Sequence, residues 1–368
     1  MSTRNAHITG WGMAVPDQVL TNDDIAKMVD TTDEWIVSRT GIHERRIANS
    51  DQTTASLASE AALRALEVAN LHPGDLDMII VATSSPEYIF PATACVVQDR
   101  IGAVKAYAFD LLAACTGFVY GINLASQAIK SNGANNILVI GSETLTRLVN
   151  WKDRNTCILF GDGAGAFVLQ ASEEPGGVLS AVLRSDGSGA NLLSVPGGGS
   201  PHPASMQTLY DGLHYIQMNG REVFRFATRV MVEATFETVE TAQMTMDDIQ
   251  LLIPHQANQR IIEAAARGLN YPMEQVMVNL DRYGNTSTAS IPIATVEAIE
   301  QGRLKPGDNT VLVAFGGGLT WGAALIQWTG PLPFQKKVSP RLVRGYARGR
   351  SILARLRRRI EGFIWGNG

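Results

Sequence analysis

The stretch LHPGDLDMIIVATSS (71–85) has a counterpart later in the chain, MTMDDIQLLIPHQAN (244–258). In both stretches an acidic turn follows a helical pattern and leads into a short apolar run. Such apolar runs are typical of strands that are buried on both faces of a parallel sheet. Repetition of this kind indicates that the chain contains two copies of one structural unit.

Further repeated segments follow in the same order in both parts of the chain. They pair AYAFDLLAACTGF (106–118) with VMVNLDRYGNTSTAS (276–290), NNILVIGSE (135–143) with NTVLVAFGGG (309–318), and FGDGAGAFVLQ (160–170) with FGGGLTWGAALIQW (315–328). Alternating strand and helix signals predict a layered α/β fold with right-handed crossovers. We therefore predict two pseudo-symmetric halves, 1–174 and 175–330, followed by an extension, 331–368.

The composition is that of an ordinary globular protein, with 45% hydrophobic and 18% charged residues among 368. The three cysteines Cys95, Cys115 and Cys157 have neither the spacing of a metal site nor that of a disulfide framework. The first residues lack the basic flank and apolar core of a signal peptide, and no apolar run is long enough to span a bilayer. We expect a cytoplasmic protein without a metal site.

Three reactive side chains are expected to meet at the ends of equivalent strands. Cys115 precedes a helical pattern, where the helix dipole lowers the pKa of a thiol, whereas Cys95 and Cys157 are typical of buried core cysteines. Asn285 occupies nearly the equivalent position in the second half, and His255 ends a predicted strand. Because α/β folds form their sites at the carboxyl ends of strands, the duplication brings these three residues into one cleft.

Each of the three residues also has a purely structural interpretation. The cysteine could be a core residue, the histidine a hydrogen-bonded structural group and the asparagine a helix cap. As a set, they also describe a papain-like protease, but the chain lacks the local cysteine signature of that family and the duplication argues against it. The other use of this set is thioester chemistry. In the second case the cysteine accepts an acyl group, and the other two donate hydrogen bonds to a second thioester as it loses CO2. The glycine runs FGDGAG and FGGG are turns, or bring a backbone amide to an oxyanion.

Several segments resemble β-ketoacyl-acyl-carrier-protein synthase III, a decarboxylating condensing enzyme of the thiolase-like superfamily. They are AFDLLAACTGF, IPHQAN, YGNTSTAS and FGGGLTWGAA, and matching blocks run through residues 5–329. The resemblance implies a duplicated thiolase-like fold layered α-β-α-β-α. It implies an acyltransferase that condenses an acyl-CoA primer with malonyl-ACP through an acyl-cysteine and so initiates fatty acid synthesis. It implies no cofactor beyond the thioester substrates.

The resemblance also implies the roles of the catalytic residues. Cys115 attacks the acyl-CoA, and the backbone amides of Cys115 and Gly317 form the oxyanion hole. His255 and Asn285 bind the thioester oxygen of malonyl-ACP and favour its decarboxylation.

The resemblance further implies a binding site for coenzyme A. Trp35 and Arg154 sandwich the adenine, and Arg39 lies toward the phosphates. Gly220 and Asn258 line the tunnel for the pantetheine arm.

Contacts with other proteins follow from the same resemblance. Arg225, Arg260 and Arg267 form a basic patch that receives the acidic acyl carrier protein, in line with charge steering. Phe90 reaches into the acyl pocket of a partner subunit, which implies a homodimer.

The extension 331–368 differs in charge from the rest of the chain. It carries ten basic residues and one acid, a net charge of +9, so the other residues, with 21 basic and 34 acidic, carry −13. Leu342, Tyr346, Leu353, Leu356, Ile360 and Ile364 recur at helical spacing, and Trp365 follows them. A basic amphipathic helix suits an anionic membrane surface, here through residues 339–365, and a peripheral location. Alternatives are a disordered tail, a helix packed on the dimer, or attraction of the carrier protein; no module for nucleic acid accompanies the charge.

Two other function classes are compatible with the sequence. One is a thiolase-fold acyltransferase or condensing enzyme of specialised metabolism that uses another acyl acceptor. The other is a non-catalytic scaffold subunit, against which the intact set of Cys115, His255 and Asn285 argues.

Overall fold

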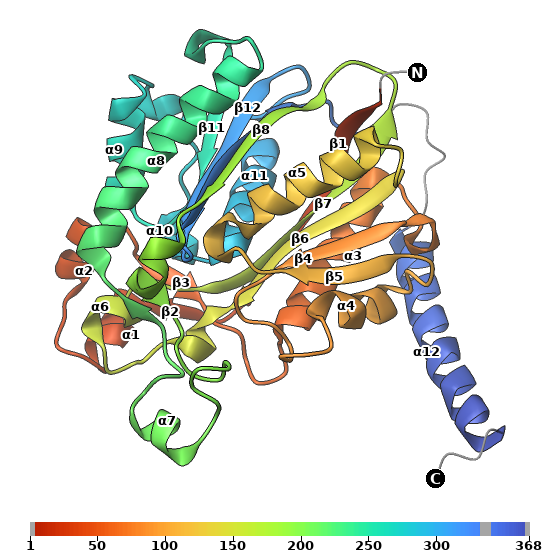
Figure 1. The fold of residues 1–368 in the computed structure, drawn as a ribbon, viewed down its shortest axis with the longest axis horizontal. Coiled ribbons are helices and arrows are strands. Elements are labelled where there is room, and N and C mark those ends of the chain that lie inside the picture. The colour runs from red at the N-terminus through yellow and green to blue at the C-terminus, as the bar shows by residue number, and fades with distance from the viewer. Residues whose placement is uncertain (1–3, 332–339, 365–368) are drawn as a thin grey trace.

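Two sheets, each flanked by helices, form the body of the molecule (Figure 1). The computed structural model describes residues 4–331 and 340–364. The first sheet has the strand order β1-β7-β6-β4-β5. Its strands are β1 (Asn5–Ala14), β4 (Met78–Ala82), β5 (Tyr107–Leu111), β6 (Asn136–Thr144) and β7 (Asp162–Ser172). β4 is parallel to β5 and β6, and every residue of β4 is buried, as its continuous apolar run predicts.

The second sheet repeats this arrangement, with the strand order β11-β12-β13-β8. Its strands are β8 (Gly177–Ser185), β11 (Leu251–Pro254), β12 (Asn309–Gly316) and β13 (Thr320–Gln327). A parallel bridge between Leu252 and Val276 stands where the first sheet has β5. β4, β6 and β7 thus correspond to β11, β12 and β13, which are the strand pairs that the repeated segments predict.

The two sheets and three layers of helices alternate to form five layers (Figure 1). α5 (Gly117–Lys130) and α11 (Ser290–Glu300) lie between the sheets, α3 (Thr54–Ala69) and α4 (Thr93–Ile101) cover the first sheet, and α8 (Gly220–Thr241) and α9 (Gln259–Gly268) cover the second. Between the sheets the ring of Phe167 lies 5.0 Å from Phe118 and 6.1 Å from Trp328, centroid to centroid. Burial of these large apolar surfaces stabilises the joined halves. The predicted α-β-α-β-α layering is confirmed.

Smaller elements surround the ends of the strands. They are β2 (Val19–Thr21), α1 (Asn22–Ala26), α2 (Asp33–Thr40), β3 (Glu44–Arg46), α6 (Arg154–Cys157), β9 (Leu193–Ser194), α7 (Met206–Tyr210), β10 (Gln217–Met218) and α10 (Leu280–Tyr283), with the 3-10 turns η1 (Pro73–Asp75), η2 (Ala114–Thr116), η3 (Leu145–Leu148), η4 (Gly187–Leu192), η5 (Met246–Asp248), η6 (Met273–Gln275) and η7 (Ser287–Ala289). η2 precedes α5, and η7 precedes α11 at the equivalent place. A separate apolar cluster, including Ile25, Ile36 and Cys157, packs α1, α2 and α6 together.

The last helix, α12 (Pro340–Ile364), packs on α3 and α4 rather than on either sheet. Among residues 342–361 of this helix, the buried side chains are those of Val343, Ala347 and Ser351. Most of the predicted apolar stripe faces away from the body, and Trp365 lies outside the described residues. No helix within the described part of the chain combines the length and the apolarity needed to cross a bilayer.

A close backbone contact joins the halves beside η7. A Cβ atom on Gly141 of β6 would overlap the carbonyl oxygen and carbon of Thr288. Only glycine therefore allows the central strand of the first half to lie against η7 of the second.

We predict that Gly141→Ala destabilises the protein by roughly 1–3 kcal/mol, because the added methyl group meets backbone that cannot move away easily. Thermal unfolding followed by circular dichroism measures the effect. Gly187→Ala is the matched control, because a Cβ there meets nothing within 4 Å. Equal melting temperatures for the two variants would contradict the role of this contact.

Candidate active site

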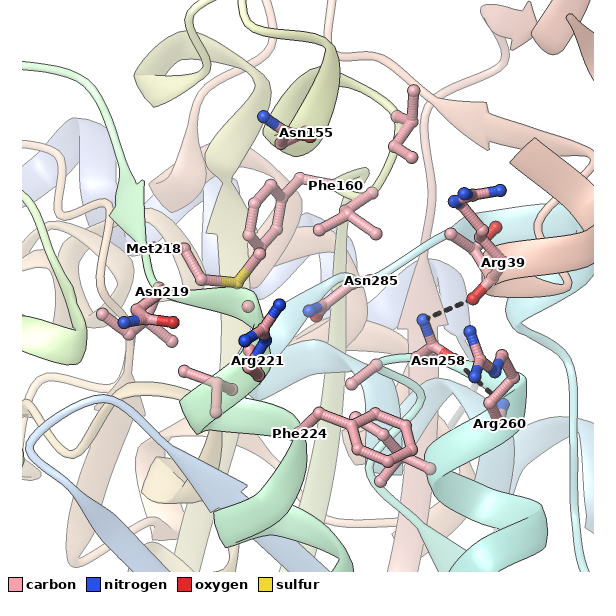
Figure 2. Close-up of a pocket in the computed structure, with 18 of the residues that line it drawn as sticks. Arg39, Asn155, Phe160, Met218, Asn219, Arg221, Phe224, Asn258, Arg260 and Asn285 are labelled. Atoms are coloured by element: carbon pink, nitrogen blue, oxygen red, sulfur yellow. Dashed lines mark hydrogen bonds between the residues drawn. The ribbon is translucent and has the colours of Figure 1, made fainter. Parts of the chain in front are cut away.

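Cys115, His255 and Asn285 line one cavity of about 830 Å³, and Figure 2 shows Asn285 among other residues of its lining. Residues of both halves line it, and its outer wall comes from α2 and from the first turns of α8 and α9. The prediction that the repeat brings these three residues into one cleft agrees with this geometry. A second cavity of about 510 Å³, lined largely by apolar residues, also contacts Cys115. Cys115 therefore lies between the two cavities.

Cys115 lies in η2, directly before α5, and only 7% of it is exposed. Burial raises the pKa of its thiol to about 12, a shift that a hydrogen bond from Ser287 opposes and the charge of Glu143 reinforces. The expected lowering of this pKa is therefore wrong, since loss of hydration is the largest influence on the thiol. Cys157 is buried as expected, whereas Cys95 lies exposed on α4.

His255 follows β11, and burial lowers its pKa to about 3, so the imidazole is neutral at physiological pH. Its Nδ1 lies 2.7 Å from Ser290 Oγ, which also accepts a 3.4 Å hydrogen bond from the Gln256 amide. The Ser290 hydroxyl can donate to Nδ1 while it accepts from that amide, because its oxygen carries one proton and two lone pairs. His255 then carries its proton on Nε2, which is buried without a hydrogen-bond partner among the described residues.

Asn285 is fixed by its own turn. Its Oδ1 accepts a 2.8 Å hydrogen bond from the Ser287 amide, and its backbone pairs with Phe160. The amide nitrogen is the end of the side chain left for the cavity, toward which it points in Figure 2. Asn285 does not orient His255, because Ser290 holds the imidazole. This arrangement differs from a cysteine protease, in which the asparagine orients the histidine.

A buried carboxylate, which was not predicted from the sequence, lies behind the cysteine. Glu143 at the end of β6 is completely buried, and burial raises its pKa. It accepts hydrogen bonds from Ser85 Oγ at 2.6 Å and from Thr288 Oγ1 at 3.1 Å. Ser287 bonds to both Glu143 and Cys115 and so connects them. An acid that ends the apolar run NILVIGSE was the available signal.

The glycine run after β12 lies directly against the cysteine. A Cβ on Gly316 would lie 2.7 Å from the amide nitrogen of Cys115. Gly317 lines the second cavity together with Cys115. The Thr320 hydroxyl lies 3.1 Å from the Gly317 carbonyl oxygen and 3.0 Å from that of Ala113, which ties the two loops together.

The residues expected to bind coenzyme A gather at the outer end of the larger cavity. The guanidinium carbons of Arg39 and Arg154 lie 4.4 and 4.6 Å from the ring centroid of Trp35. Trp35, Arg39, Gly220 and Asn258 line the cavity. Asn258 is also structural, since its Nδ2 donates to the Arg39 carbonyl at 3.0 Å and its Oδ1 accepts from the Arg260 amide at 2.9 Å (Figure 2).

The three arginines expected to receive the carrier protein lie at and outside the mouth. Arg260 lines the cavity and lies 5.7 Å from the Phe224 ring. Arg225 on α8 and Arg267 on α9 are exposed outside its lining, and Arg225 pairs with Glu222. Arg221, which the sequence analysis did not assign, also lines the cavity.

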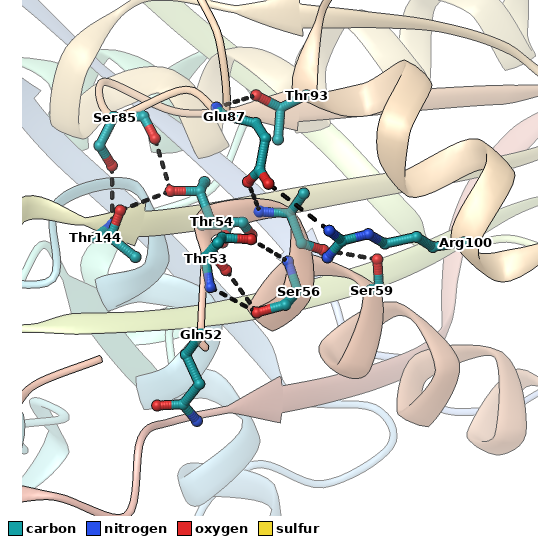
Figure 3. A network of polar contacts seen from close by, with 12 residues as sticks. Gln52, Thr53, Thr54, Ser56, Ser59, Ser85, Glu87, Thr93, Arg100 and Thr144 are labelled. Atoms are coloured by element: carbon teal, nitrogen blue, oxygen red, sulfur yellow. Dashed lines mark hydrogen bonds and ion pairs between the residues drawn. The ribbon is translucent and has the colours of Figure 1, made fainter. Parts of the chain in front are cut away.

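Phe90 lies in the loop between β4 and α4, is 84% exposed and lines neither cavity of its own chain. A polar network holds the base of this loop (Figure 3). Thr54 Oγ1 donates to the Ser85 carbonyl at 2.6 Å, and Glu87 pairs with Arg100 at 3.7 Å. The exposed aromatic ring therefore stands on an anchored loop.

Family comparisons cover both halves of the chain. The family model described as 3-oxoacyl-[acyl-carrier-protein] synthase III matches residues 109–187, and the model of its C-terminal part matches residues 239–328. Beta-ketoacyl-[acyl-carrier-protein] synthase III of Roseiflexus sp. is 55% identical over 324 residues, which are 88% of this chain and 98% of that protein. The enzyme of the same name from Desulfitobacterium hafniense is 56% identical over 322 residues, 88% of this chain and 97% of that protein.

Comparison with solved structures agrees with the family comparison. The 3-oxoacyl-[acyl-carrier-protein] synthase III of Aquifex aeolicus has a TM-score of 0.82 and 49% identity, with 88% of this chain and 100% of that one covered. The priming β-ketosynthase of the R1128 polyketide pathway has a TM-score of 0.83 at 33% identity, with coverage of 90% and 98%. The predicted thiolase-like fold is confirmed.

We predict that alkylation of Cys115 by iodoacetamide accelerates about tenfold per pH unit between pH 7 and 10, because the thiolate fraction of a group with a pKa near 12 keeps rising there. Mass spectrometry of the Cys115 peptide in a Cys95→Ser background measures the rate. Glutathione is the control, since free thiols level off near their pKa of about 8.5. A plateau for Cys115 below pH 9 would contradict a thiol that burial keeps protonated.

Proposed function

Since the chain belongs to the β-ketoacyl-[acyl-carrier-protein] synthase III family, we propose that Cys115, His255 and Asn285 perform this family's condensation in the cavity between the halves. The protein is an acyl-transferring condensing enzyme of fatty acid synthesis. The observation that carries the residue assignment is the neutral imidazole of His255, whose protonated Nε2 shares a cavity with Cys115 and Asn285.

The first step transfers the primer from acyl-CoA to Cys115. The sulfur attacks the thioester carbonyl, the bond from that carbonyl to the sulfur of coenzyme A breaks, and the thiol proton ends on the released coenzyme A. The backbone amides of Cys115 and Gly317 stabilise the transient oxyanion. The apolar second cavity beside Cys115 supports a role as the space for the acyl chain.

The second step joins this acyl group to malonyl-ACP. His255 Nε2–H and Asn285 Nδ2–H donate hydrogen bonds to the malonyl thioester oxygen. The bond to the carboxylate then breaks, CO2 leaves, and the enolate that remains is stabilised by the two donors. Its carbon attacks the acyl-cysteine carbonyl, Cys115 leaves as thiolate and regains a proton, and a 3-oxoacyl-ACP forms. A neutral histidine suits a donor that stabilises developing negative charge.

The substrates enter by the wide mouth of the larger cavity. Trp35, Arg39 and Arg154 hold the nucleotide end of coenzyme A, for which the Arg154 side chain moves off the Trp35 ring to admit the adenine. Gly220 and Asn258 line the path of the pantetheine arm. Arg225, Arg260 and Arg267 attract the acidic carrier protein, whose approach the negative body would otherwise disfavour. The reaction requires the two thioesters, acyl-CoA and malonyl-ACP, and no further cofactor.

The working unit of this proposal is a homodimer. β5 ends the first sheet, and one of its edges has no partner strand within residues 4–331 and 340–364. Its side chains Tyr107 and Phe109 are exposed. The nearby loop carries Ile89 and Phe90, which are 86% and 84% exposed. Unpaired edges with apolar side chains favour strand pairing with a second chain. A twofold axis beside β5 would bring each Phe90 toward the partner.

The organisation and location of the chain complete the proposal. The halves are 1–174 and 175–330, a boundary that falls between the end of β7 and the start of β8. The enzyme works in the cytoplasm.

We predict that His255→Ala keeps acylation within a few-fold of the wild type but lowers decarboxylation by about 10²–10³-fold, the usual cost of one lost oxyanion donor. Incorporation of radiolabelled acyl groups from acyl-CoA and CO2 release from malonyl-ACP measure the two steps separately. Cys115→Ser is the control that abolishes the labelled acyl-cysteine. Equal loss of both steps in His255→Ala would indicate a general-base histidine instead.

We predict by light scattering a mass about twice the 39.7 kDa of one chain. Tyr107→Lys with Phe109→Lys should give monomers, since like charges would meet across the paired edge. Phe236→Lys on the exposed face of α8 is the control and leaves the mass unchanged. A wild-type monomer would exclude the shared acyl pocket.

A further inference from the structure

The helix α12 lies beyond the part of the chain that the C-terminal family model matches, which ends at residue 328. It is attached to the body by a face of small residues. Val343 joins the apolar cluster under α3 and α4, and Ala347 packs so closely on Gly102 that a Cβ there would lie 3.0 Å from the Ala347 Cα. Ser351 Oγ donates to Asp99 at 3.1 Å. These contacts dock the helix closely against α4.

Aromatic and ionic contacts reinforce this attachment. The ring of Tyr346 lies 3.6 Å from that of His72, centroid to centroid. Arg344 pairs with Glu67 at 2.8 Å, and Arg358 approaches Asp99 at 3.6 Å. The orientation of α12 relative to the body is therefore fixed by contacts along about four turns.

The docked face leaves the large apolar side chains on the outside. At 100° per residue, the outward residues fall within one stripe on the side opposite Val343 and Ala347. We call this set the outer stripe: Leu342, Ile352, Leu353, Leu356 and Ile360, whose exposed fractions lie between 50% and 68%. A surface helix normally packs its large apolar residues against the protein. In α12, by contrast, the large apolar residues face away from the protein.

Arginines border the outer stripe on both sides. Arg348 and Arg359 lie along one edge, and Arg350 and Arg357 along the other, by the same helical spacing. Residues 342–361 contain seven arginines and one acid, Glu361. Within the described residues, no carboxylate pairs with Arg348, Arg350 or Arg359.

We propose that α12 binds the surface of an anionic lipid bilayer, with the outer stripe inserted among the acyl chains and the bordering arginines on the lipid phosphates. An apolar stripe flanked by arginines is the pattern of helices that lie in the plane of a membrane. Arg344 and Arg358 are occupied by the body, and Arg357 pairs with Glu361 on the helix itself. Arg348 and Arg359, which pair with no carboxylate among the described residues, remain for the phosphates. The docked helix thus holds the α3–α4 side of the enzyme next to the lipid.

Charge complementarity favours an anionic lipid surface over two protein partners, a second copy of this chain and the acidic carrier protein. A second copy that used the same stripe would bring two arginine-rich edges together, which costs free energy through repulsion between like charges. An acidic carrier protein would match the arginines but would leave five large apolar side chains to be covered. The body carries −13 and is repelled by anionic lipid, so the basic helix is the part of this chain that reverses that repulsion. The proposal is independent of the condensation chemistry.

Co-sedimentation of the full chain with vesicles tests the proposal. The probe is phosphatidylcholine with about 30 mol% phosphatidylglycerol, compared with pure phosphatidylcholine. We expect binding to the anionic vesicles that is lost at about 0.5 M salt, since screening weakens the arginine–phosphate contacts.

Matched variants separate the stripe from the charge. Leu353→Ser with Leu356→Ser should reduce binding roughly tenfold or more, because two inserted leucines are lost. Phe236→Ser, an exposed apolar side chain on α8, is its control and leaves binding unchanged. Arg348→Gln with Arg359→Gln should also reduce binding, and Arg184→Gln with Arg229→Gln changes the net charge equally on the body.

The outcomes of these binding experiments either support or overturn the proposal that α12 binds anionic lipid. The proposal is supported if the helix variants lose vesicle binding while the two controls bind normally and all variants keep the condensation rate with soluble substrates. It is overturned if the full chain ignores anionic vesicles at low salt or if the outer-stripe variant binds as well as the wild type. A change of molar mass in the outer-stripe variant would assign the stripe to a second copy and overturn it too.

Discussion

The close contact between the two halves is the constraint on which the site depends. Gly141 of β6 lies against Thr288 in η7, and Gly316 of β12 lies against the amide of Cys115 in η2. Each half thus brings a central strand against a turn of the other half, and that turn carries Cys115 in one case and closely follows Asn285 in the other. Without a side chain at these glycines, the turns before α5 and α11 approach closely enough for Cys115 and Asn285 to share a cavity.

Burial at this contact determines the protonation states of the reactive groups. The same loss of hydration that raises the pKa of Cys115 lowers that of His255, so both groups are uncharged at physiological pH. A neutral imidazole held by Ser290 is a fixed hydrogen-bond donor and needs no proton uptake during a turnover. A site of this kind stabilises the negative charge that develops on a thioester oxygen during decarboxylation, whereas a cysteine protease uses its histidine as the base that takes the proton of the thiol.

The repeated segments allowed the sheets and the meeting of the three residues to be predicted, because strand periodicity and duplication constrain the topology strongly. The partners of those residues could not be predicted. Ser290, Ser287 and Glu143 act through contacts between segments far apart in the sequence. The direction of the Cys115 shift depends on how tightly the cavity is closed, which the position before a helix does not reveal.

The orientation of α12 also could not be predicted from the sequence. Its pattern predicts an amphipathic helix, and apolar stripes usually face the protein. Here small side chains at Ala347 and Gly102 permit a close helix contact, and this contact turns the large apolar residues outward. Helical periodicity identifies the faces of a helix but not which of them packs on the body.

The central claim is that the same cavity binds two thioesters one after the other. Mass spectrometry of the wild-type enzyme tests this claim most directly. After exposure to acyl-CoA, the Cys115 peptide should gain the mass of the acyl group. Addition of malonyl-ACP should then remove this mass as CO2 and 3-oxoacyl-ACP appear together. An unmodified Cys115 across a panel of acyl-CoAs, or an acyl group that persists after malonyl-ACP is added, would contradict the account.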